Sequence, residues 1–136
     1  MGARFLKIAV VYFVIGVVFG MYMGIAQQFQ FSSVHAHVNL LGWVSLALAG
    51  IVYTLYPQAA KSGLGKAHFW LHNIGLPIMV IGLYVELAGF GKATPLISAG
   101  GTIAIIGIIL FAINVFKYVN EKSAASSRDV RNDVSL

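Results

Sequence analysis

The chain has 136 residues, of which 59% are hydrophobic and 10% are charged. A soluble domain usually has about 25% charged residues, and a small globule cannot hide such an excess of apolar side chains, so this composition argues against a soluble enzyme and predicts a membrane protein. The net charge of +5 does not indicate a nucleic-acid partner, because the nine Lys and Arg lie at the termini and in short connections rather than along one face. The chain has no cysteine, so any metal or cofactor must be held by nitrogen or oxygen ligands.

Four apolar segments are long enough to cross a membrane as helices. A helix rises 1.5 Å per residue, so about 20 residues cross a hydrocarbon core of about 30 Å. Pro57 follows the second segment, and Thr94 with Pro95 suits an N-cap and the first position of a helix. The predicted spans are 5–26, 34–56, 67–90 and 95–118. They form an all-α, four-helix transmembrane domain over residues 1–119, followed by a polar tail over 120–136.

The positions of Lys and Arg predict the orientation in the membrane. They lie before the first span, between the second and third, and after the fourth, whereas the other two connections contain Lys92 alone. By the positive-inside rule both termini and the central connection are cytoplasmic. We therefore expect a multi-pass protein of a bacterial-type inner membrane, with a poorly ordered cytoplasmic tail.

The first span also allows a second interpretation, a signal peptide that ends at small residues. Its apolar run is longer than the usual apolar segment within a signal peptide, and it contains Gly16, Gly20 and Gly24 at four-residue spacing. A row of small residues suits close contact between helices in lipid. We expect a retained helix that uses this row to contact a neighbour.

Two histidines lie one turn inside the second span, and ionisable side chains there indicate a function. Residues two apart on a helix differ by about 200° in direction, so His35 and His37 point to opposite sides and do not share one compact metal site. Asn39 and Gly42 follow on the His35 side. A small residue such as Gly42 leaves room for a flat macrocycle whose iron an imidazole ligates. The alternative is hydrogen bonding across a bundle, with Asn39 as a partner.

Two further histidines, His68 and His72, begin the third span. They are four residues apart on one helix face, a spacing that suits two ligands of one metal ion. The neighbouring Phe69 and Trp70 favour instead a belt of aromatic rings at the headgroup level. We expect His68 and His72 to anchor the helix at the interface, with copper or zinc binding as the alternative.

Two segments resemble a known family. Segment 34–42, VHAHVNLLG, resembles the tenth helix of subunit I in the haem-copper oxidase superfamily, nearest to the cbb-type oxidase and nitric oxide reductase branches. Segment 68–75, HFWLHNIG, resembles the start of the helix that follows, so the chain resembles helices nine to twelve of that subunit. In that family the first histidine of the motif serves the high-spin haem and the second the low-spin haem. The resemblance implies these roles for His35 and His37.

The chain also departs from the family. Subunit I has twelve helices in three arcs of four, whereas this chain has one arc and lacks the family's copper-binding histidines, so whether it is an enzyme stays open. Three copies would rebuild the bundle as a homotrimer, with haem b between His35 of one copy and His37 of the next. This hypothesis implies electron transfer or redox sensing, with a redox partner that the sequence does not name. The alternatives are a haem-free structural or assembly protein and a protein that binds zinc or copper through histidines.

Overall fold

The computed structural model describes residues 1–120, and residues 121–136, which contain nearly all of the predicted tail, lie outside the described part. Four helical segments within 1–120 are long and apolar enough to cross a membrane: Gly2–Ala26, Phe29–Leu55, Gly63–Leu87 and Thr94–Tyr118. Within residues 1–120 this confirms the prediction of an all-helical fold with four helices long and apolar enough to cross a membrane. The largest difference in bounds is at the second span, which begins at Phe29 rather than at residue 34.

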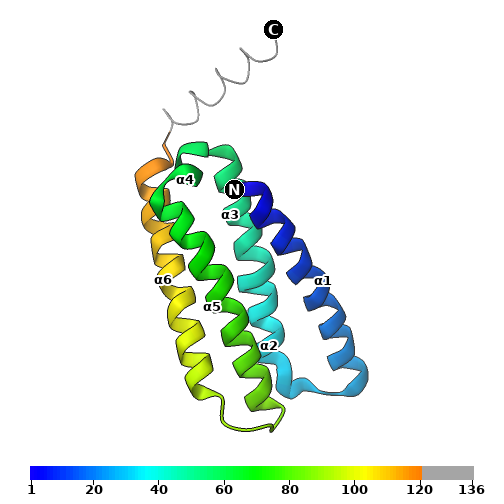
Figure 1. Cartoon of the computed structure of the whole chain (residues 1–136). Helices are drawn as coiled ribbons and strands as arrows, with labels where there is room; N and C mark the ends of the chain where they lie inside the picture. Colours follow the sequence, from blue (N-terminus) through cyan, green and yellow to red (C-terminus); the bar gives the residue numbers. More distant parts are fainter. Residues whose placement is uncertain (121–136) are drawn as a thin grey trace.

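The helices run up and down in chain order (Figure 1). The second span consists of four helical pieces, and a short helix connects it to the third. The elements are α1 (Gly2–Ala26), η1 (Phe29–Phe31), α2 (Ser32–His37), η2 (Val38–Ser45), α3 (Leu46–Leu55), α4 (Pro57–Lys61), α5 (Gly63–Leu87) and α6 (Thr94–Tyr118). The unusual piece is η2, a π-helix with wider turns than an α-helix.

The start of α6 differs by one residue from the sequence prediction. Ala93 is the N-cap and Thr94 is the first helical residue. The carboxylate of Glu86 accepts hydrogen bonds from the Ala93 backbone N–H at 3.0 Å and from the Thr94 hydroxyl at 3.1 Å. A carboxylate at a helix N-terminus satisfies free N–H groups and interacts favourably with the helix dipole, so Glu86 replaces the predicted threonine cap.

Glycines bring α5 and α6 into backbone contact. A Cβ atom on Gly75 would lie 2.5 Å from the Ala104 backbone nitrogen, and one on Gly100 would lie 2.4 Å from the Met79 backbone nitrogen. No side chain fits in either position, so the two helix backbones touch. Helices in lipid associate mainly through such close packing, because apolar side chains gain little by leaving lipid.

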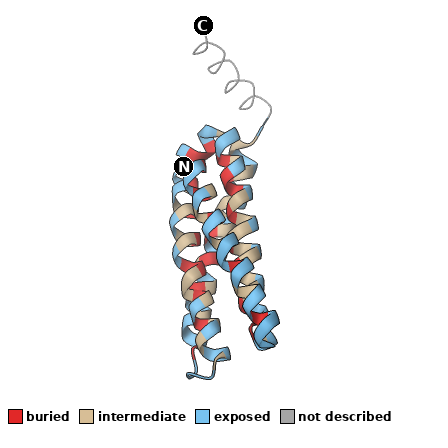
Figure 2. Cartoon of the chain, turned by 90° about the vertical axis from the view of Figure 1, so that its right-hand side faces the viewer, coloured by how far each residue is buried: buried red, intermediate tan, exposed pale blue. Residues whose placement is uncertain are grey.

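The N-terminus, the α3–α4–α5 connection and the end of α6 lie at the same end of the bundle (Figure 1). We call this the charged end, because Arg4, Lys61 and Lys66 lie there, whereas Lys92 lies in the connection at the opposite end. Figure 2 shows the buried residues inside the bundle and two groups of helices that diverge toward the opposite end. The main core cluster, which includes Phe5, therefore lies toward the charged end.

Candidate functional site

The His35 side of the second span faces α1. A Cβ atom on Gly20 would lie 2.6 Å from the Cε1 atom of His35, and one on Gly16 would lie 2.5 Å from the Oδ1 atom of Asn39. The predicted row of glycines is therefore a helix contact at these two positions. It does not extend to Gly24, where an added Cβ would meet nothing within 4 Å in the described chain.

The space beside Gly42 is filled within the chain. Gly42 is buried, and a Cβ atom there would lie 2.5 Å from the Cδ1 atom of the Tyr12 ring. The sequence prediction left this space for a macrocycle, and in the single chain the tyrosine ring from α1 lies there. Any macrocycle at this level has to lie outside the single four-helix unit.

The ring of His35 is half-buried and has no short hydrogen bond. The amide nitrogen of Asn39 donates to the His35 backbone carbonyl at 2.9 Å, whereas it lies 3.4 Å from the Nδ1 atom and 3.5 Å from the Nε2 atom of the ring. Hydrogen bonds weaken at such distances. Both ring nitrogens of His35 are therefore only loosely engaged within residues 1–120, so either nitrogen is available as a ligand.

His37 has a different environment, in agreement with the two-residue spacing. Its Nδ1 atom lies 2.7 Å from the carbonyl oxygen of Ser33. Because a carbonyl only accepts, Nδ1 carries the proton, and the lone pair on Nε2 has no partner within residues 1–120. The ring is half-buried and lines a surface pocket of about 220 Å³ with Ala36, Leu40 and Leu41. His37 therefore presents a free imidazole nitrogen on the side away from α1.

The other two histidines are buried, so the interfacial anchoring prediction is wrong for both. His68 and His72 are each 1% exposed. The ring of His68 packs 5.1 Å from the ring of Phe5 and 4.8 Å from that of Phe111, both inside the bundle. Trp70, which lies between the two histidines in sequence, is 63% exposed and takes the outward direction instead.

A chain of hydrogen bonds runs through this buried pair. The Nε2 atom of His72 lies 3.1 Å from the Leu41 carbonyl oxygen in η2, and its Nδ1 atom lies 3.2 Å from Nε2 of His68. The Nδ1 atom of His68 lies 2.9 Å from the Tyr53 hydroxyl, which accepts from the amide of Asn114 at 3.3 Å. Because the Leu41 carbonyl only accepts, each imidazole donates from Nε2 and accepts at Nδ1, and Tyr53 donates to His68. We call these five residues the buried polar chain.

The hydrogen bonds of the buried polar chain use every ring nitrogen of His68 and His72, so neither residue has a free nitrogen for a metal ion. All four ring nitrogens of His68 and His72 take part in hydrogen bonds. Within residues 1–120 no group of three or more His, Cys, Asp or Glu side chains is placed to hold a metal ion. The buried polar chain joins α3, α5 and α6 to η2. Buried polar groups in a membrane bundle need such partners. The geometry of the buried polar chain fits a structural link between the second span and the helices α5 and α6.

Sequence reasoning missed Asn114. This side chain is 0% exposed; it donates to the Ala59 carbonyl at 3.0 Å and accepts from the Ser62 hydroxyl at 3.1 Å. It thus connects α6 to α4 as well as to Tyr53. The sequence does contain a signal for this residue, because Asn114 is a lone amide in an apolar span. An amide in such a position usually has a buried polar partner. Tyr53 gave no comparable signal, because aromatic residues are common near the ends of membrane helices.

Replacing Tyr53 with phenylalanine is expected to lower the free energy of unfolding in detergent micelles by about 0.6–2 kcal/mol, because His68 loses a donor and Asn114 an acceptor. Unfolding can be followed by circular dichroism during titration with a denaturing detergent. Tyr22→Phe is the matched control, since Tyr22 is 50% exposed on α1. Equal losses in the two variants would contradict a role for the buried polar chain.

Part of the chain is similar to a known oxidase subunit. Over 75 residues it is 32% identical to the protein named Cbb3-type cytochrome c oxidase subunit CcoN1 of Stutzerimonas stutzeri. The match includes 51% of this chain and 16% of that subunit, so this chain matches a small part of the relative. No protein-family model and no solved structure matches the chain. The comparison supports a distant relationship to a haem-copper oxidase subunit.

Proposed function

We propose that this chain is a membrane haem protein that transfers electrons or senses redox state, with one haem b held between neighbouring copies. His37 of one copy and His35 of the next would hold the haem iron, and three copies would form the assembly. When bound, the haem iron supplies one-electron redox chemistry. The observation on which this proposal rests is the free Nε2 atom of His37 at the surface of the bundle.

The environment of His37 fits an axial ligand. A ligating histidine usually donates its other ring N–H to a carbonyl or carboxylate, which fixes the tautomer and the ring orientation. The carbonyl of Ser33 does this for His37. Leu40, beside the ring, is 61% exposed and provides an apolar surface against which a macrocycle or a neighbouring copy packs.

The environment of His35 supports a site that needs a second copy. His35 lies against Gly20 of α1 and is half-exposed, while the Tyr12 ring closes the space beside Gly42. One chain therefore offers two histidines on different sides and no internal space for a macrocycle between them. The distant similarity to an oxidase subunit adds independent support for haem, although the chain corresponds to a small part of that subunit.

The proposal is tested by purifying the full chain in detergent with haem supplementation, then recording its visible spectrum and its mass by light scattering. The expected results are a Soret band of six-coordinate haem, about one haem per chain, and the mass of three copies. Absence of a Soret band after supplementation contradicts haem binding. Metal analysis of the haem-free protein then separates the two alternatives, because a zinc or copper protein retains metal and a structural protein does not.

A further inference from the structure

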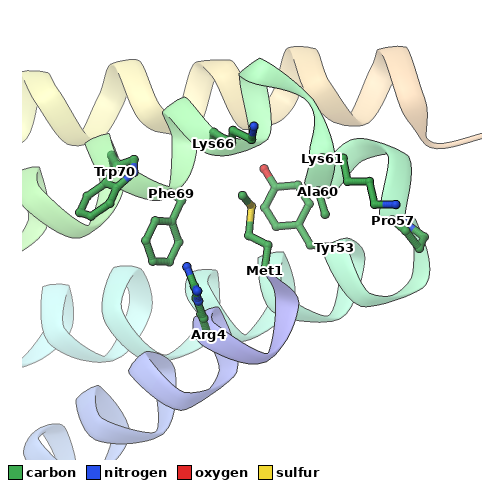
Figure 3. A pocket seen from close by; sticks show the side chains of 9 residues that line it. All are labelled: Met1, Arg4, Tyr53, Pro57, Ala60, Lys61, Lys66, Phe69 and Trp70. Carbon is green, nitrogen blue, oxygen red and sulfur yellow. The ribbon is translucent and has the colours of Figure 1, made fainter.

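A pocket of about 530 Å³ lies at the charged end of the bundle (Figure 3). It is formed by parts of α1, α3, α4 and α5, and Tyr53 lies at its inner side. The pocket lies where α3 ends at Leu55 and α5 begins at Gly63. It therefore lies near the ends of two membrane spans, at the depth where lipid headgroups meet the hydrocarbon core.

Three cationic side chains surround this pocket. Arg4 comes from α1, Lys61 from α4 and Lys66 from α5, and Figure 3 shows them at different sides of the pocket. The single carboxylate within residues 1–120 is Glu86, which caps α6 at the opposite end of the bundle. Residues 121–136 contain three acidic and three basic residues, so they bring no net negative charge. Three cations around one pocket therefore favour an anionic ligand from outside the chain.

The pocket also has an apolar wall. Phe69 and Trp70 line it, and the Phe69 ring is held in edge-to-face contact with the ring of Phe5 at 5.1 Å. Trp70 is 63% exposed, which is typical of an indole at the membrane interface. A free phosphate ion needs the cations alone, whereas a phospholipid needs cations beside an apolar surface. The combination favours a lipid.

We propose that this pocket binds the phosphate headgroup of an anionic phospholipid. Arg4, Lys61 and Lys66 surround the phosphate, and Phe69 and Trp70 contact the glycerol and the first part of the acyl chains. Basic pockets between membrane helices bind anionic headgroups in this manner, and anionic lipid attracts basic residues near the membrane surface. Binding a lipid at this pocket joins α1, α4 and α5. The site involves neither His35 nor His37, so it holds whether or not the chain binds haem.

The test uses the purified full chain without haem in neutral detergent and measures the shift in Tm on adding lipid. Micelles with phosphatidylglycerol are expected to raise Tm, whereas phosphatidylcholine and inorganic phosphate at the same ionic strength are not. The double variant Arg4→Gln/Lys66→Gln is expected to weaken the apparent affinity for phosphatidylglycerol about 25-fold, from about fivefold per cation. Lys7→Gln/Lys117→Gln is the matched control, since it removes the same charge from the same end outside the pocket.

Three results would overturn the proposal. The first is an equal Tm shift with phosphatidylcholine, which indicates general lipid packing. The second is an equal shift with inorganic phosphate, which indicates a site for a free anion. The third is an equal loss of affinity in the two double variants, which indicates attraction by net charge. Because the shift on adding lipid is compared within each variant, a lower Tm of a variant before lipid is added does not affect the result.

Discussion

Replacing His37 with alanine is expected to abolish the Soret band of the purified, haem-supplemented protein. The reason is that His37 has a fixed tautomer and, within residues 1–120, an Nε2 atom without a partner at the bundle surface. Even a lost hydrogen-bond partner of a ligating histidine costs about 10- to 100-fold in metal affinity, so loss of the ligand itself is expected to cost about 100-fold or more. The measurement is a haem titration followed by visible absorption.

Free imidazole separates a lost ligand from a misfolded bundle. His37 lines a surface pocket of about 220 Å³, so imidazole from solution can reach the position that the removed ring occupied. We expect imidazole to restore much of the haem absorbance of His37→Ala. A variant that keeps the wild-type spectrum, or one that imidazole leaves unchanged while circular dichroism shows a folded bundle, contradicts axial ligation by His37.

Co-expression of two variants tests whether the ligands come from different copies. A site between copies is complete where a His37→Ala copy, which keeps His35, adjoins a His35→Ala copy, which keeps His37. With random mixing in a closed ring, about a quarter of the sites regain both ligands. We therefore expect about a quarter of the wild-type haem content from the mixture and none from either variant alone. A mixture without haem contradicts ligands from neighbouring copies.

The four spans could be predicted from the sequence because a run of apolar residues is itself the requirement for crossing a membrane. The glycine row could be predicted in part, because a row of small residues is itself what close contact between helices in lipid requires. Gly16 and Gly20 contact the second span, whereas Gly24 lies beyond the last contact. Spacing identifies the helix face with small residues but does not tell how far along that face the neighbouring helix continues.

The surroundings of the histidines could not be predicted, because a helix that is apolar on all sides does not indicate which side faces lipid. His68 and His72 share a face as their spacing predicts, but the adjacent Trp70 suggested the interface for all three. Their partners, Tyr53 and Asn114, come from other helices. The π-helical turns after His37 have no sequence signal either, although the Leu41 carbonyl within them ends the buried polar chain.

Replacing Gly100 with alanine is expected to cause a large loss of stability, because α5 and α6 are in backbone contact at this position. An added Cβ would lie 2.4 Å from the backbone nitrogen of Met79 and 2.7 Å from the backbone oxygen of Gly75. Backbone atoms inside a helix cannot move aside as a flexible side chain does, so the two helices must separate along their length. We expect the free energy of unfolding to fall by about 2–3 kcal/mol, as in other overpacked cores.

The adjacent glycine provides the matched control for this variant. Within 4 Å in the described part of the chain, a Cβ on Gly101 would meet only the Sδ atom of Met79, at 3.4 Å, which is an ordinary contact with a flexible side chain. Gly101→Ala is therefore expected to leave stability unchanged or to raise it by up to about 1 kcal/mol through helix propensity. Unfolding of both variants by denaturing detergent, followed by circular dichroism, gives the comparison. Similar stabilities for Gly100→Ala and Gly101→Ala would mean that α5 and α6 do not pack through their backbones at this position.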